Sequence, residues 1–251
     1  MPYAIAMAGK GGTGKTTIAG FLIRYLVQKG KTPILAVDAD SNTNLNEVLG
    51  VSIRASLGRA REEMKDGVVK QGMTKQMFME MKLAEAVVEG DGFDLIGMGR
   101  PEGAGCYCAA NHLLSMYLEK MIDHYPYMVM DNEAGMEHIS RLTTNNVDVL
   151  LVVSDPSIRG IEAAHRINTL VDELKVRAAK RFLIINQARD GLTDSLQEAI
   201  VKHGLNLAGT LPQDDLLYDF DMKGNPTVTL PADSPALSAA FDIFDKIIEV
   251  D

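Results

Sequence analysis

The sequence lacks any run of about 20 apolar residues, the length that spans a bilayer, and no basic stretch follows Met1 as it would in a secretory signal. We therefore expect a cytoplasmic protein without a membrane partner. Basic charge is also scarce, because 25 Lys and Arg residues stand against 34 Asp and Glu residues, a net charge of -9. This balance argues against a surface built mainly to bind nucleic acid or anionic lipid, since both partners would be repelled, and leaves open only a local basic patch.

Cysteine is nearly absent as well, and the two cysteines lie one residue apart, at Cys106 and Cys108. Two cysteines are too few for a disulfide framework in a chain of 251 residues. They are either a pair of buried thiols, which pack as small hydrophobes, or a pair of exposed ligands. Glycines at positions 99, 103 and 105 indicate a loop, which favours exposed ligands.

Short apolar runs rich in Val, Ile and Leu alternate with helical stretches along the whole chain. This βαβ rhythm predicts an α/β fold with a mostly parallel sheet and helices on both faces. The absence of internal repeats and linkers predicts a single domain over residues 1–251. Residues 54–92 look helical and are rich in methionine, which fills cores or forms adaptable binding surfaces. The expected strands are 3–8, 33–38, 93–97, 127–131, 147–153, 182–186 and 207–211.

A glycine-rich loop follows the first strand and has the pattern GxxxxGK[ST] over residues 9–16. An apolar-periodic helix is expected directly after it, over residues 18–28. In this context the loop predicts a phosphate cradle: glycines let backbone N–H groups turn inward, Lys15 adds a positive charge, and Thr16 offers a hydroxyl to Mg²⁺.

Two further strands end in carboxylates. The strand over 33–38 is followed by Asp40, and the strand over 127–131 ends at Asp131, with Gly135 shortly after. Such carboxylates can hold Mg²⁺ through water and orient the attacking water, while the glycine can present an N–H to the terminal phosphate. Alone, each aspartate could be a helix cap; beside a phosphate cradle, they indicate nucleotide hydrolysis.

The base can be inferred from the segment after the strand over 182–186. It reads Asn186-Gln187-Ala188-Arg189, where guanine readers usually carry Asn-Lys-x-Asp. Arg189 replaces the carboxylate that would accept the N–H groups of guanine. The segment therefore favours adenine.

The second lysine of the cradle, Lys10, makes the segment from Lys10 to Thr17 resemble the deviant Walker A ATPases of the SIMIBI-type P-loop NTPases. This resemblance implies a homodimer in which Lys10 reaches the phosphates of the partner subunit. It also implies catalytic roles for Lys10, Lys15, Asp40 (switch I) and Asp131 (switch II). The nucleotide-binding residues that it implies are Gly11, Gly12, Thr13, Gly14, Lys15, Thr16, Thr17, Gly135, Asn186, Pro212 and Asp214.

Within that group, the order of the cradle, the pair Cys106 and Cys108, and the segment from Asp131 to His138 is similar to the CooC-type ATPases. The resemblance implies an ATP-hydrolysing metallochaperone that helps to insert nickel into carbon monoxide dehydrogenase or acetyl-CoA synthase. ATP, Mg²⁺ and Ni²⁺, or Zn²⁺ in place of nickel, are the implied ligands. The metal is expected to be shared across the homodimer.

The number of thiolates is consistent with such sharing. Soft divalent metals usually have four ligands, and one chain supplies only Cys106 and Cys108. A two-fold dimer would supply four sulfurs. His112 is either a spare ligand or a capping residue.

Two other classes of protein compete with this interpretation. A positioning ATPase of the Min or Par type would act on a membrane or on DNA; however, the amphipathic segment 235–251 is acidic, so we expect it to pack on the sheet. An iron-sulfur carrier would need a second cysteine near Asp131, and none is present. A nucleotide-gated binding module with negligible turnover is a third alternative.

Overall fold

The computed structural model describes residues 2–40, 42–53, 55, 63, 73–99, 119, 121–132, 146–189 and 191–248. Eight strands form one sheet in the order β3-β4-β2-β5-β1-β6-β7-β8. Every described pairing is parallel except that of β3 with β4. The strands are β1 (Tyr3–Gly9), β2 (Ile34–Asp38), β3 (Val87–Glu89), β4 (Phe93–Gly97), β5 (Tyr127–Asp131), β6 (Asn146–Ser154), β7 (Arg177–Ala188) and β8 (Leu207–Pro212).

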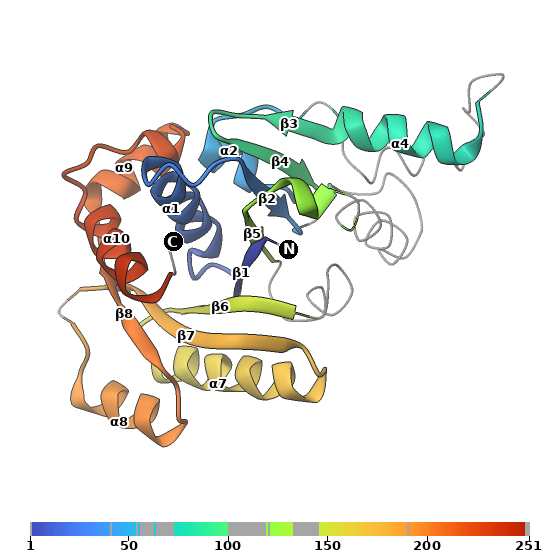
Figure 1. Cartoon of the computed structure of the whole chain (residues 1–251). Coiled ribbons are helices and arrows are strands. Elements are labelled where there is room, and N and C mark those ends of the chain that lie inside the picture. The colour runs from blue at the N-terminus through green and yellow to red at the C-terminus, as the bar shows by residue number, and fades with distance from the viewer. Residues whose placement is uncertain are drawn as a thin grey trace.

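Helices cover both faces of this sheet (Figure 1). One face packs against α7 and α8, and the other against α1, α2 and α10, so that two apolar layers enclose the strands. This arrangement confirms the predicted α/β fold. The helices are α1 (Lys15–Gln28), α2 (Leu45–Leu49), α4 (Lys75–Ala86), α7 (Ile158–Glu173), α8 (Asp194–Lys202), α9 (Asp215–Lys223) and α10 (Pro235–Ile247), with 3-10 turns η1 (Ile122–His124) and η2 (Thr227–Thr229).

The last helix, α10, buries its apolar side against α1 and β8, as expected for the amphipathic end of the sequence. Its contact with α1 centres on Tyr25, whose ring meets those of Phe241 and Phe244 edge-on at 5.3 and 5.5 Å between centroids. The Tyr25 hydroxyl donates to Asp245 at 2.7 Å, and Lys29 pairs with the same oxygen at 2.8 Å. Hence α10 is fixed to the helix that follows the phosphate cradle. Within the described residues, no helix is long and apolar enough to cross a membrane.

Three elements differ by more than two residues from what the sequence predicts. The prediction of helix across the whole of 54–92 is wrong at its end, because Val87–Glu89 form the antiparallel edge strand β3. Two consecutive β-branched residues there pair with Leu95 and Ile96 of β4. Strand β7 begins five residues before the expected 182, and α1 begins at Lys15 rather than at 18.

The parallel strands carry their carboxyl ends to one edge of the sheet. Register pairs Asp38 with Asp131 across β2 and β5, and Met7 of β1 with Asp131. Strand β1 lies between β5 and β6, and the glycine-rich loop leaves its end at Gly9. Those predicted nucleotide-binding residues that the structure describes therefore lie at the edge where open α/β sheets hold their ligands.

Candidate functional site

The glycine-rich loop has a backbone that side chains would obstruct at two points. Gly9 has φ +152°, and a Cβ there would lie 2.3 Å from the carbonyl oxygen of Val153. Gly14 has φ +90°, and its Cβ would lie 2.3 Å from the Asn186 amide nitrogen. Glycine at both positions lets the loop curl tightly between β1 and α1. The result is a concave backbone at the amino end of a helix, which suits an anion.

Inside this loop, two side chains donate to the same carbonyl oxygen. Thr13 Oγ1 donates to the carbonyl of Lys10 at 2.9 Å, and Lys15 Nζ donates to it at 3.2 Å. The Lys15 side chain is buried, whereas Lys10 is exposed. The two lysines predicted to be catalytic therefore differ: one charge lies inside the cradle and the other is open to solvent.

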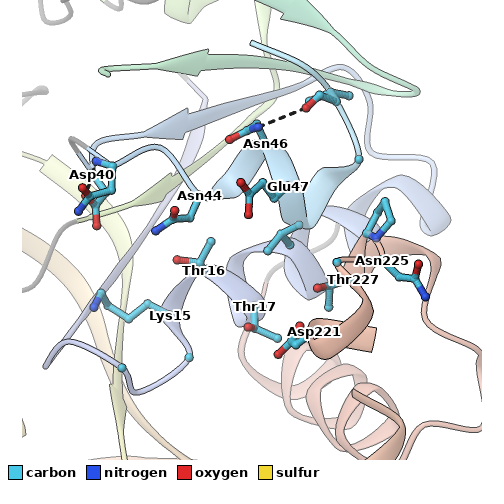
Figure 2. A pocket seen from close by; sticks show the side chains of 18 of the residues that line it. Lys15, Thr16, Thr17, Asp40, Asn44, Asn46, Glu47, Asp221, Asn225 and Thr227 are labelled. Atoms are coloured by element: carbon cyan, nitrogen blue, oxygen red, sulfur yellow. Dashed lines mark hydrogen bonds between the residues drawn. The ribbon is translucent and has the colours of Figure 1, made fainter. Parts of the chain in front are cut away.

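A cavity of about 1130 Å³ opens directly above the loop. Figure 2 places Lys15 and Asp40 at one end of it and Asp221 and Thr227 at the other, with Thr16 and Thr17 between them. The remaining polar lining comes from α2, from the segments on either side of α2, from the end of β5 and from the segment after α9. These lining residues include Asn42, Asn44, Asn46, Glu47, Ser52, Asn132 and Asn225.

Two buried carboxyls lie beside the cradle at the ends of β2 and β5. Burial raises the pKa of Asp38 to about 7, with a smaller increase from Asp131 and a decrease from the N–H groups of Leu45 and Asp40. Burial also raises the pKa of Asp131 to about 6, against lowering by the Thr16 hydroxyl and Lys15. Asp131 Oδ1 is buried and has no hydrogen-bond partner among the described residues.

An unsatisfied carboxylate oxygen next to a threonine hydroxyl is the donor set that Mg²⁺ prefers. The residues therefore fit a magnesium–nucleotide complex: the glycine loop for its phosphates, and Thr16 and Asp131 for the ion, directly or through water. Asn132, next to Asp131, donates to the carbonyl of Met7 at 2.7 Å and ties the end of β5 to β1.

A second cavity of about 700 Å³ continues from the first and shares Gly14, Thr17, Gln187 and Asp221 with it. Asn186 and Pro212, both expected near the base, line this second cavity. The Asn186 amide donates to the carbonyl of Thr13 at 2.9 Å, so the end of β7 also supports the cradle.

Asp214 lines the same cavity, but its carboxylate is occupied within the protein. Oδ1 accepts from the N–H groups of Leu216 and Leu217 at 2.9 and 3.3 Å. Oδ2 accepts from the Ser234 hydroxyl and from the N–H of Ala236 at 3.1 Å. Asp214 thus caps α9 and also holds the first turn of α10.

Sequence reasoning missed the residues that form the far end of the first cavity. One feature of the sequence could have indicated Asn44, Asn46 and Glu47: an asparagine stands at every second position after Asp40. Asp221 and Thr227 had no such signal, because the chain brings them to α1 from more than 200 residues away. Cys106, Cys108, His112 and Gly135 lie outside the described residues. In the described part of the chain, no group of three His, Cys, Asp or Glu side chains could hold a metal.

Residues 4–228 match the CobQ/CobB/MinD/ParA nucleotide binding domain. The chain belongs to this family. As a member of the CobQ/CobB/MinD/ParA family, the chain is an ATPase. This membership implies that its ligands are ATP and Mg²⁺.

This family member is similar to other proteins in sequence and in structure. An uncharacterized ATP-binding protein of Methanocaldococcus jannaschii is 40% identical over 248 residues, 97% of this chain and 98% of the relative. The carbon monoxide dehydrogenase accessory protein CooC of Rhodospirillum rubrum is 32% identical over 193 residues, 69% of this chain and 70% of the relative. Among solved structures, the septum site-determining protein MinD of Pyrococcus horikoshii, complexed with Mg-ADP, has a TM-score of 0.74 at 19% identity, covering 99% and 97% of the two chains.

Proposed function

We propose that this ATPase is a metallochaperone of the CooC type, which uses ATP to help deliver nickel to carbon monoxide dehydrogenase or acetyl-CoA synthase. The observation that carries the proposal is the combination of a CooC relative at 32% identity with a Cys-x-Cys pair in the same chain. Thiolates at this spacing suit a soft divalent cargo such as Ni²⁺ or Zn²⁺.

The position of the cysteines along the chain supports a link between metal and nucleotide. The chain leaves the sheet at Gly97, at the edge that carries the cradle, where the N–H of Met98 donates to the carbonyl of Asp38 at 2.9 Å. Cys106 follows Gly97 by nine residues, a tether of at most about 30 Å. The cysteine pair and the phosphates are therefore connected to the same edge of the sheet.

A homodimer would complete both sites. Two copies of Cys106 and Cys108 supply four sulfurs to one ion on a two-fold axis. The Lys10 side chain is exposed, whereas that of Lys15 lies inside the cradle, so Lys10 would be available to reach the phosphates of a partner subunit. ATP and metal would then favour the same closed dimer, and hydrolysis would loosen it.

Anaerobic titration with Ni²⁺ tests the proposal, with and without ATP, read by light scattering and by metal content. We expect one nickel ion per two chains and a dimer that reverts to a monomer in Cys106→Ser. Tyr107→Phe is the matched control, since it alters the same segment and spares both sulfurs. A wild-type protein that stays monomeric and metal-free would end the proposal and leave the ATPase activity in place.

A positioning ATPase is less well supported. Likeness to MinD at 19% identity concerns the fold, while α10 buries its apolar residues against α1 and β8 instead of presenting them to a lipid surface. Sedimentation with anionic liposomes or with DNA would separate the two functions. Binding to either one, together with failure to bind nickel, would favour the positioning role. An iron-sulfur carrier would be brown when purified without oxygen, so a colourless protein excludes it.

A further inference from the structure

Asp38 is a fully buried carboxylate at the end of β2, two residues before Asp40, the aspartate expected to orient water. Its side chain is 0% exposed. Oδ1 accepts from the N–H of Asp40 at 3.1 Å, and Oδ2 accepts from the N–H of Leu45 at 2.9 Å. The two oxygens therefore hold both ends of the turn that connects β2 to α2.

The carboxylate is itself firmly placed, because the strands on both sides bind the backbone around it. The N–H of Ala39 donates to the carbonyl of Asp131 in β5 at 2.9 Å, and the N–H of Met98, after β4, donates to the carbonyl of Asp38 at 2.9 Å. A side chain anchored between two strands can hold a turn in one position. The turn needs such support, since Thr43 has a left-handed backbone with φ +46°.

Burying a carboxylate costs free energy, so the use of aspartate here requires a reason. Both partners of Asp38 are N–H donors, and a carboxylate accepts at both oxygens. Asparagine would accept at one oxygen and turn its NH₂ group toward the other donor. Of the two side chains, aspartate alone satisfies both ends of the turn.

Asp40 depends on this turn for its position. Its carboxylate accepts from the N–H of Asn42 at 2.8 Å, its carbonyl accepts from Thr43 at 3.1 Å, and its N–H is held by Asp38. Figure 2 shows Asp40 at the same end of the cavity as Lys15. Movement of the turn would carry the Asp40 carboxylate away from the phosphates.

We propose that Asp38 is a positioning residue for ATP hydrolysis, which acts by holding the Asp40–Leu45 turn so that Asp40 faces the cradle. This inference rests on the proposed role of Asp40 as the water-orienting residue. Asp38 contributes little to nucleotide affinity, because the phosphates are held by the loop over residues 9–16.

A double-mutant cycle tests the inference with Asp38→Asn, Asp40→Asn and the double variant. The readouts are kcat and KM for ATP and the Kd of a nonhydrolysable ATP analogue. We expect Asp38→Asn to lower kcat by about 10- to 100-fold, the effect of a small misplacement, with KM and Kd within about threefold. In the Asp40→Asn background, Asp38→Asn should have no further effect on kcat. Asp94→Asn, on neighbouring β4, is the matched control and should keep the wild-type kcat.

The outcomes separate the two roles. An Asp40→Asn variant with the wild-type kcat would show that the proposed role of Asp40 is wrong. If Asp40→Asn is slow while Asp38→Asn keeps the wild-type kcat, or lowers it by the same factor in both backgrounds, then the positioning role of Asp38 is overturned.

Amide hydrogen exchange on the wild-type protein gives a test that does not require a folded variant. The N–H groups of Asp40 and Leu45 should exchange slowly, like that of Ile18, which is bonded to the carbonyl of Gly14 at 3.0 Å in α1. Exchange of Asp40 and Leu45 at unprotected rates would mean that the carboxylate does not hold the turn, which also contradicts the proposal.

Discussion

Two buried carboxylates at the same edge of the sheet, Asp214 and Asp131, differ in their hydrogen bonds and in the direction of their pKa shifts. Asp214 accepts four hydrogen bonds, and although burial raises its pKa, the donors of Ser234 and the α9 and α10 backbone outweigh burial and leave the pKa below its ordinary value. Asp131 keeps one oxygen without a partner among the described residues, and its pKa rises to about 6. The comparison suggests that Asp214 stabilises the fold, whereas Asp131 is held ready for a ligand.

The largest expected effect is on catalysis at Asp131. Asp131→Asn removes the charge predicted to hold Mg²⁺, so steady-state phosphate release should fall by about 100-fold or more. The free energy of unfolding of the nucleotide-free protein, measured in urea, should stay the same or increase, since a poorly satisfied buried charge is removed. Loss of stability with normal turnover would reverse the assignment.

Asp214→Ala should have the opposite signature. Removing an acceptor that serves two helix starts should cost about 2–4 kcal/mol of unfolding free energy, measured by urea denaturation. The kcat at 25 °C should remain within about threefold of wild type. A raised KM for ATP without loss of stability would instead indicate that Asp214 helps to bind the base of the nucleotide, as the family resemblance implies.

The pH dependence of stability should follow from the raised pKa values of Asp38 and Asp131. Both groups bind protons in the folded state at a pH where the unfolded chain, with an ordinary pKa of 3.8, has released them. Their contribution to stability therefore increases as the pH falls from 8 toward 5. Below about pH 4 the contribution of Asp214 is lost, because its pKa is lowered.

Differential scanning calorimetry between pH 5 and 8 checks this prediction. The melting temperature of the nucleotide-free protein should increase by a few degrees toward pH 5, at about 2–4 °C per kcal/mol for a chain of this size. Asp131→Asn should reduce the dependence of the melting temperature on pH. Saturating Mg-ATP should reduce this dependence further, because it favours the ionised carboxylates. An unchanged slope in Asp131→Asn would contradict the assignment of the titration to that residue.

The smallest expected effect concerns a third carboxylate, Asp245, which lies near the surface. Lys29→Ala removes an ion pair whose side chains are 44% and 52% exposed, so it should cost at most about 1 kcal/mol. Tyr25→Phe removes a hydrogen bond from a buried hydroxyl to the same oxygen and should cost about 1 kcal/mol. Urea denaturation of both variants measures the difference. A cost above about 3 kcal/mol for Lys29→Ala would place Asp245 with Asp214 instead.

Most of the fold could be predicted because its signals are local. Buried parallel strands are continuous apolar runs, and the glycine loop between β1 and α1 has its own spacing. Strand β3 could not be predicted, since Val87 and Val88 form a strand only through pairing with β4. The early start of β7 at Arg177 has a similar cause: its pairing with β6 begins at Asn146.

The residues of the candidate site also differ in whether a local sequence signal could predict them. Lys15, Asp40 and Asp131 stand next to strand ends, and their convergence follows from parallel topology alone. The involvement of Asp221 and Thr227 depends on how α9 and η2 pack near α1, which no local pattern encodes. The bonds from Asp214 to the start of α10 were equally hidden, because Ser234 and Ala236 lie 20 and 22 residues further along the chain.

The packing of α10 on α1 also affects how the protein matures during synthesis. The cradle and α1 leave the ribosome before α10, and the apolar surface around Tyr25 is covered only after Phe241 and Phe244 have been added. Nascent chains stalled before residue 235 should therefore expose that surface to chaperones.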